Sequence, residues 1–190
     1  MASTQTFLTD VQELRRKARE NMERGAITQQ YGLDPKQAVD VLNQALATEI
    51  VCVLRYKRHY FAAKGLNKDA VAQEFLEHAN DEQGHADRIS ERIEQLGGDP
   101  DLNPATLTTR SHSEYVEAHD LVDMIKENLV AERVAIESYT EMVRFFGERD
   151  VTSRRLMEEI LAVEEEHAND MLDLIDQIID KSSNGKGSHK

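Results

Sequence analysis

Two residue types that bind metals occur twice in this sequence at the same spacing. Glu82 and His85 lie three residues apart, and Glu164 and His167 repeat the pattern. In each copy the histidine is followed by Ala and then by Asp or Asn. Residues three apart project from the same face of a helix, so each pair presents a carboxylate and an imidazole together. Such oxygen and nitrogen ligands suit iron or manganese, and the recurrence predicts a metal site.

Two further glutamates occupy matching positions in the two halves of the chain. Glu49 is followed seven residues later by Tyr56, and Glu132 is followed seven residues later by Tyr139. Seven residues make nearly two helical turns, so each tyrosine lies on the face of its glutamate, about 10 Å along the axis. Each half then continues with a Glu-x-x-His pair, which indicates an internal duplication with a pseudo-two-fold axis.

The elements that must position these residues are helices. The sequence contains no Trp, 3 Pro and 9 Gly, a composition typical of helical proteins. Apolar residues that recur every three or four positions, with capping residues at the ends, predict one short amphipathic helix and four long helices. The expected ranges are 10–24 for the short helix, and 35–64, 67–96, 111 or 113 to 146, and 152–180 for the long ones, with 98–112 as a long connection.

The lengths of these helices bring the four glutamates to one level. Short turns join the helices in pairs, so each pair forms an antiparallel hairpin. Each glutamate lies 16 or 17 residues from its own turn, or roughly 24 Å at about 1.5 Å per residue. Two divalent cations would balance the charge of four buried carboxylates. The alternative, exposed Glu and His on charged helix faces, is disfavoured because apolar residues such as Leu46 and Val53 flank these positions.

This arrangement resembles the ferritin-like di-iron carboxylate proteins over about residues 36–180. It is most similar to bacterioferritins and related non-haem ferritins, through the segment 82–93. The predicted helices form an all-α fold, a ferritin-like four-helix bundle of two antiparallel hairpins joined by a long crossover, and the short N-terminal helix is an addition to this family pattern. The resemblance implies two iron ions per subunit, with manganese as the alternative. The implied ligands are Glu49 and His85 for one metal, Glu132 and His167 for the other, and Glu82 and Glu164 bridging both; Tyr56 and Tyr139 would be hydrogen-bond partners or electron donors.

Several departures from these families bear on cofactor and assembly. Bacterioferritins carry a haem-ligating Met directly after the second-helix glutamate, whereas this chain has Gln83, so no haem is expected. Cage ferritins of 24 subunits usually have a fifth helix, which the polar tail here does not supply. Basic termini are similar to those of the twelve-subunit Dps miniferritins, but Dps metal sites lie between subunits. Rubrerythrins share the Glu-x6-Tyr pattern but need paired cysteines, and this chain has Cys52 alone.

Length and charge limit the remaining possibilities. The 190 residues are expected to form an N-terminal extension over 1–33, a ferritin-like bundle over 34–181 and a disordered basic tail over 182–190. A net charge of −13 does not favour DNA binding, although the tail could contact phosphates. We expect a cytoplasmic protein with no secretory signal and no membrane-spanning segment. A dimer-based homo-oligomer or a cage is expected.

The predicted function is a ferroxidase that oxidises Fe(II) with O2 or H2O2 for iron storage and detoxification. The alternatives are a peroxide-scavenging di-metal enzyme, similar to rubrerythrin or manganese catalase, and a Dps-like DNA-protecting miniferritin. Of the other residues, Cys52 is expected to be a small buried side chain. His78 could guide iron or hold a water, and is otherwise an ordinary polar residue. His59, His112 and His119 are expected at the surface.

Overall fold

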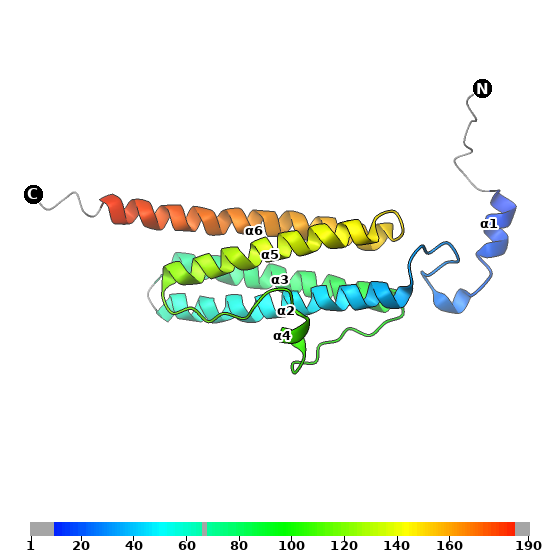
Figure 1. The fold of residues 1–190 in the computed structure, drawn as a ribbon, viewed down its shortest axis with the longest axis horizontal. Helices are drawn as coiled ribbons and strands as arrows, with labels where there is room; N and C mark the ends of the chain where they lie inside the picture. The colour runs from blue at the N-terminus through cyan, green and yellow to red at the C-terminus, as the bar shows by residue number, and fades with distance from the viewer. Residues whose placement is uncertain (1–9, 66–67, 185–190) are drawn as a thin grey trace, which may run out of the picture.

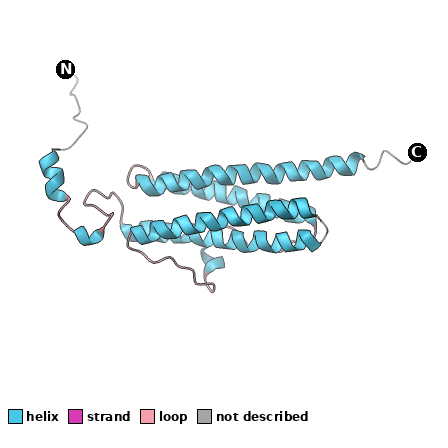
Figure 2. Ribbon diagram, turned by 180° about the vertical axis from the view of Figure 1, so that it is seen from behind, coloured by secondary structure: helices cyan, strands magenta, loops and turns pink. Residues whose placement is uncertain are grey.

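The computed structural model describes residues 10–65 and 68–184, and every regular element in these ranges is a helix (Figures 1 and 2). The hairpin of α2 and α3 packs against the hairpin of α5 and α6, and α1 lies beyond one end of the bundle (Figure 1). The predicted all-α four-helix bundle with an extra N-terminal helix is confirmed. The helices are α1 (Val11–Lys17), α2 (Pro35–Gly65), α3 (Asp69–Gln95), α4 (Leu107–Arg110), α5 (Leu121–Phe146) and α6 (Val151–Asn184), with a 3₁₀ turn at Met22–Arg24.

The turns of both hairpins lie where the sequence predicts them, and so do the bounds of α2. α2 begins at Pro35, as its cap-and-proline signal predicts. α3 begins at Asp69. Asn67, which the sequence predicts as its cap, lies outside the described residues. Between α5 and α6, Gly147 adopts φ +47°, and Asp150 accepts a hydrogen bond from Ser153 N at 2.9 Å, which caps α6. α6 continues to Asn184, beyond its predicted end at 180.

The crossover is longer than predicted, and the third long helix begins later. Residues 111 and 113 do not start it; α5 begins at Leu121, where Asp120 accepts a hydrogen bond from Asp123 N at 3.0 Å. The segment before it is extended along α2. Arg55 Nη1 donates to Glu114 O at 2.9 Å, and a ring nitrogen of His59 lies 3.0 Å from Glu117 O. His59 is fully buried, so its predicted surface position is wrong.

The N-terminal helix is shorter than its periodicity predicts. α1 ends at Lys17, and Asn21 adopts a left-handed φ of +53° before the 3₁₀ turn. None of its residues is buried, and 40% of Leu14 is exposed, because the helix does not pack on the bundle. The chain joins the bundle further on, where Tyr31 Oη donates to Asp150 Oδ2 at 2.7 Å. Arg92 Nη2 pairs with the other oxygen of Asp150 at 2.9 Å.

The apolar core has two parts, separated by the level of the predicted metal ligands. On each long helix the glutamate lies between a residue of one cluster and a residue of the other. On α2, for example, Leu46 belongs to one cluster and Tyr56 to the other, with Glu49 between them. The first cluster includes Leu42, Leu46, Ile89, Ile93, Phe146, Met157 and Ile160, and the second includes Tyr56, Phe75, Met124, Ile125 and Met171. Both clusters exclude water from the polar layer between them.

One described helix has the length and apolar composition to cross a membrane. It is α2, over Pro35–Lys64, with a mean hydropathy of 1.2 in its most apolar window, 56% of which is buried. Core helices of bundles have the same composition, and α2 carries buried Glu49, Arg55 and His59. We attribute its apolar character to burial against α3 and α5.

Candidate metal centre

The six predicted ligands lie together in the middle of the bundle, and all are buried. Glu49 comes from α2 and Glu132 from α5, while α3 and α6 each supply one Glu-x-x-His pair. Their ligand atoms form two overlapping groups, each with atoms within 4.8 Å of one another. The groups are Glu49, Glu82, His85 and Glu164, and Glu82, Glu132, Glu164 and His167. Glu82 and Glu164 belong to both groups.

The two shared carboxylates each direct one oxygen toward each imidazole. Glu164 Oε1 lies 3.0 Å from His85 Nδ1, and Glu164 Oε2 lies 3.8 Å from His167 Nδ1. Glu82 Oε2 lies 3.6 Å from His85 Nδ1, and Glu82 Oε1 lies 3.9 Å from His167 Nδ1. This is the arrangement that two bridging carboxylates need between two metal ions. The grouping matches the ligand assignment that the family resemblance implies, and metal binding by these residues stays a prediction.

Burial and mutual repulsion perturb the pKa values of this cluster. Burial, followed by the charges of Glu164 and Glu49, raises the pKa of Glu82 well above its usual range. Burial and the charge of Glu164 do the same to the pKa of Glu132. Burial alone would lower the pKa of His85, but Glu164 and Glu49 outweigh it and raise that pKa to about 10. Cations bound at this cluster would compete with protons for these groups.

Several buried ligand atoms have no hydrogen-bond partner within the protein. These atoms are Glu82 Oε1, both Glu164 carboxylate oxygens, Glu132 Oε2 and His167 Nδ1. A buried carboxylate oxygen without a partner costs about 1–3 kcal/mol or more, so four such oxygens and one imidazole nitrogen in one place need an explanation. Bound cations would satisfy all of them, because carboxylate oxygens and imidazole nitrogens are the donors that iron and manganese accept. The donor set thus fits a dinuclear metal centre.

The two predicted tyrosines hydrogen-bond to ligands of the opposite hairpin. Tyr56 Oη donates to Glu132 Oε1, and Tyr139 Oη donates to Glu49 Oε1. The sequence places each tyrosine on the face of its own glutamate, but the structure pairs it with the glutamate of the other half. The exchange is reciprocal, as the pseudo-two-fold symmetry requires. Each hydrogen bond fixes one carboxylate oxygen; the other oxygen of Glu132 has no partner, and the other oxygen of Glu49 lies 3.2 Å from His85 Nδ1.

We expect Tyr56→Phe and Tyr139→Phe each to lower the free energy of unfolding of the metal-free protein by about 1–3 kcal/mol. Each change leaves a buried carboxylate oxygen without its donor. Urea denaturation followed by circular dichroism measures the effect. Tyr115→Phe is the control, because Tyr115 is 42% exposed and its substitution should change stability by no more than about 0.5 kcal/mol. Equal stability of all three variants would show that these hydrogen bonds contribute nothing.

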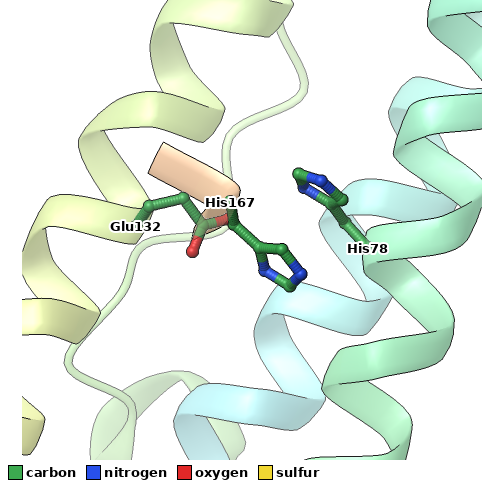
Figure 3. A group of neighbouring side chains, drawn as sticks. All are labelled: His78, Glu132 and His167. Atoms are coloured by element: carbon green, nitrogen blue, oxygen red, sulfur yellow. The ribbon is translucent and has the colours of Figure 1, made fainter. Parts of the chain in front are cut away.

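Two further residues surround His167, and the sequence had singled out only one of them, His78. His167 Nε2 lies 3.4 Å from Asp81 Oδ2, so this carboxylate can hold the proton on Nε2 and leave Nδ1 free as a ligand. The ring of His78 stacks on the ring of His167, with centroids 3.8 Å apart and planes inclined by 17°. Figure 3 shows the His167 ring between His78 and Glu132. Asp81 directly precedes Glu82, and His78 lies one helical turn before it. This proximity to a predicted ligand is the feature of the sequence that points to both residues.

Comparison with known proteins identifies the family. Residues 39–180 match the sequence model of the ferritin family, described as a ferritin-like domain. The chain belongs to the ferritin-like family. Over 132 residues, this ferritin-like chain is 26% identical to a bacterioferritin of Desulfovibrio desulfuricans, a match that covers 69% of this chain and 70% of the relative.

Two other proteins of known description are similar to this ferritin-like chain. It is 28% identical over 137 residues to a nutrient stress-induced DNA-binding protein of Synechococcus, covering 70% of this chain and 77% of the relative. Its fold is similar to that of a dodecameric thioferritin, the bacterioferritin-related protein of Bacteroides fragilis. The two structures share 34% sequence identity and a TM-score of 0.76, over 80% of this chain and 92% of the other.

Proposed function

We propose that this ferritin-like protein is a ferroxidase that binds two Fe(II) ions per chain at the six clustered ligands and stores the oxidised iron. The observation that carries the proposal is the double sharing of Glu82 and Glu164, each with one oxygen toward His85 and one toward His167. Glu49 and Glu132 complete the two groups. Four carboxylates match the charge of two divalent ions, which removes the repulsion described above.

The proposed reaction uses iron as its substrate. Oxidation of two Fe(II) ions releases two electrons, which with two protons reduce O2 to H2O2 or H2O2 to two molecules of water. The carboxylate-rich site favours the Fe(III) product, because hard anionic oxygen ligands stabilise the higher charge. Tyr56 and Tyr139 hold two of the ligand carboxylates in place during the change of charge. Manganese is the alternative metal, and the absence of haem stays a prediction based on Gln83.

We also propose a homo-oligomeric shell as the assembly. The twelve-subunit relative from Bacteroides fragilis supports it, because it shares the fold over most of both chains. Large apolar side chains exposed on α2 and α5 also support it, since they would be covered by neighbouring subunits. These residues are Leu54, Phe61 and Val130.

The test mixes metal-free protein with Fe(II) in air-saturated buffer near neutral pH. We expect Fe(II) oxidation at least roughly ten times faster than in protein-free buffer, with about two Fe(II) consumed for each O2 reduced to H2O2. Absorbance of the Fe(III) product and an oxygen electrode measure the two quantities. Preloading with Zn(II), which has no redox chemistry, should suppress the acceleration. A rate no faster than that in buffer would overturn the proposal.

Two other functions remain as alternatives. Faster oxidation by H2O2 than by O2 in the same assay, without retained iron, would favour a peroxide-scavenging enzyme. The similarity to the Synechococcus relative, which is a DNA-binding protein, supports a Dps-like role as the second alternative. The net charge of −13 opposes such binding, and the basic end of this chain lies outside the described residues. Iron oxidation is therefore the function that the geometry supports best.

A further inference from the structure

A second group of metal-ligating side chains lies beside the six proposed ligands, between α3 and α6. His78 Nε2 lies 3.4 Å from Asp170 Oδ2 and 3.6 Å from Glu74 Oε1. One atom from each residue lies within 4.8 Å of the others. Only 3% of the His78 side chain is exposed, compared with 34% for Glu74 and 46% for Asp170. The group therefore combines a buried imidazole with two carboxylates that solvent can reach.

The hydrogen bonds of His78 assign the proton of its ring. Tyr56 has one hydroxyl proton, which it donates to Glu132, so it can only accept from His78 Nδ1 at 3.1 Å. The neutral ring thus carries its proton on Nδ1, and its Nε2 presents a lone pair. Nε2 is buried and makes no hydrogen bond within the protein. The two carboxylate oxygens that this lone pair faces are acceptors, so they supply no hydrogen-bond donor to it. Three electron-pair donors that face one another are what a cation site requires.

The charges around this group also call for a cation. Burial and the negative charge of Asp170 raise the pKa of Glu74, and burial raises the pKa of Asp170. On the inner side, the ring of His167 stacks against His78. No Lys or Arg forms an ion pair with Glu74 or Asp170 among the described residues.

We propose that Glu74, His78 and Asp170 form a third divalent-cation site, separate from the dinuclear centre and next to it. Two carboxylates and one imidazole form a ligand set that binds Fe(II), Co(II) or Mn(II) and leaves further coordination positions for water. Its two exposed carboxylates face solvent, while its imidazole stacks on a proposed ligand of the dinuclear centre. The site would thus hold one Fe(II) ion between solvent and the dinuclear pair.

Equilibrium dialysis of the metal-free whole protein against Co(II), followed by metal analysis, tests the third site. We expect about three Co(II) ions per chain for the native protein and about two for the Glu74→Gln, Asp170→Asn double variant. Both substitutions keep the side-chain shape at half-exposed positions, so the fold should persist, which circular dichroism checks. Asp173→Asn, an exposed position three residues further along α6, is the matched control and should bind like the native protein.

A second double variant, Glu82→Ala with Glu164→Ala, separates the two proposals. It should lose the dinuclear pair and retain about one Co(II) ion per chain, which the additional Glu74→Gln, Asp170→Asn substitutions remove. Two ions in both the native protein and the Glu74→Gln, Asp170→Asn variant would overturn the third site and leave the dinuclear centre intact. One ion in the native protein, lost with Glu74 and Asp170, would overturn the dinuclear centre instead.

Discussion

Replacing Glu164 by Ala is expected to lower the initial rate of Fe(II) oxidation by at least about 100-fold. Replacing Glu49 by Ala should also lower this rate, but one ion should stay bound in the dinuclear cluster. Glu164 directs an oxygen toward each imidazole, so its loss removes a ligand from both positions. Glu49 belongs to the His85 group alone. The reaction needs two electrons and hence both ions, but binding at the second position does not need Glu49.

Stopped-flow absorbance gives the oxidation rates, and metal analysis after anaerobic loading gives the number of ions bound. Glu165→Ala is the matched control, because this neighbouring carboxylate is exposed. It should oxidise Fe(II) at the native rate. Near-native oxidation and metal binding by Glu164→Ala would contradict the assignment of this residue as a bridging ligand. An equal loss of both ions in Glu49→Ala would contradict the division of the ligands into two groups.

Metal loading is expected to stabilise the fold strongly. A ligand that binds the folded state alone, at a free concentration of about 1,000 times its dissociation constant, adds about 4 kcal/mol per site. For a chain of this length, 4 kcal/mol corresponds to a rise in melting temperature of about 8–16 °C. The physical reason is that cations would bind the unpaired oxygens of a buried cluster and displace its protons. Burial and repulsion already raise the pKa values of Glu82 and Glu132 in this cluster.

Thermal unfolding with Co(II) or Zn(II), and again with excess chelator, measures this stabilisation at constant protein concentration. The Glu82→Ala, Glu164→Ala variant should lose most of the increase, because it lacks both shared ligands. The metal-free forms of the variant and of the native protein are also compared, so that the loss of the buried contacts of Glu164 is separated from the loss of metal binding. A melting temperature that metal does not change in the native protein would show that the cluster binds no cation tightly.

The interior of the bundle was predictable from the sequence for a simple reason. Helical periodicity fixes which residues share a face, and the distance of each residue from its turn fixes its height. Together these placed Glu49, Glu82, Glu132 and Glu164 at one level. The structure brings all four together, with the two histidines beside them.

The crossover and the N-terminal segment were predicted less well. The helix predicted to begin at Ser111 or Ser113 begins at Leu121, because Asp120 caps it and the preceding residues bind α2 through Arg55 and His59. His59 was expected at the surface for the same reason: its partner is a backbone carbonyl 58 residues away in sequence. Contacts of this range leave no local pattern.

The sequence by itself determined the fold class, the ligand types and the height at which the ligands meet, because these depend on spacing along single helices. The tertiary structure alone decided how the helices are rotated against one another. That rotation pairs Tyr56 with Glu132 and Tyr139 with Glu49, across the two hairpins. It also stacks His78 on His167 and turns His78 Nε2 toward Asp170. Periodicity names the face of a helix, but packing against the other helices selects the partner that this face meets.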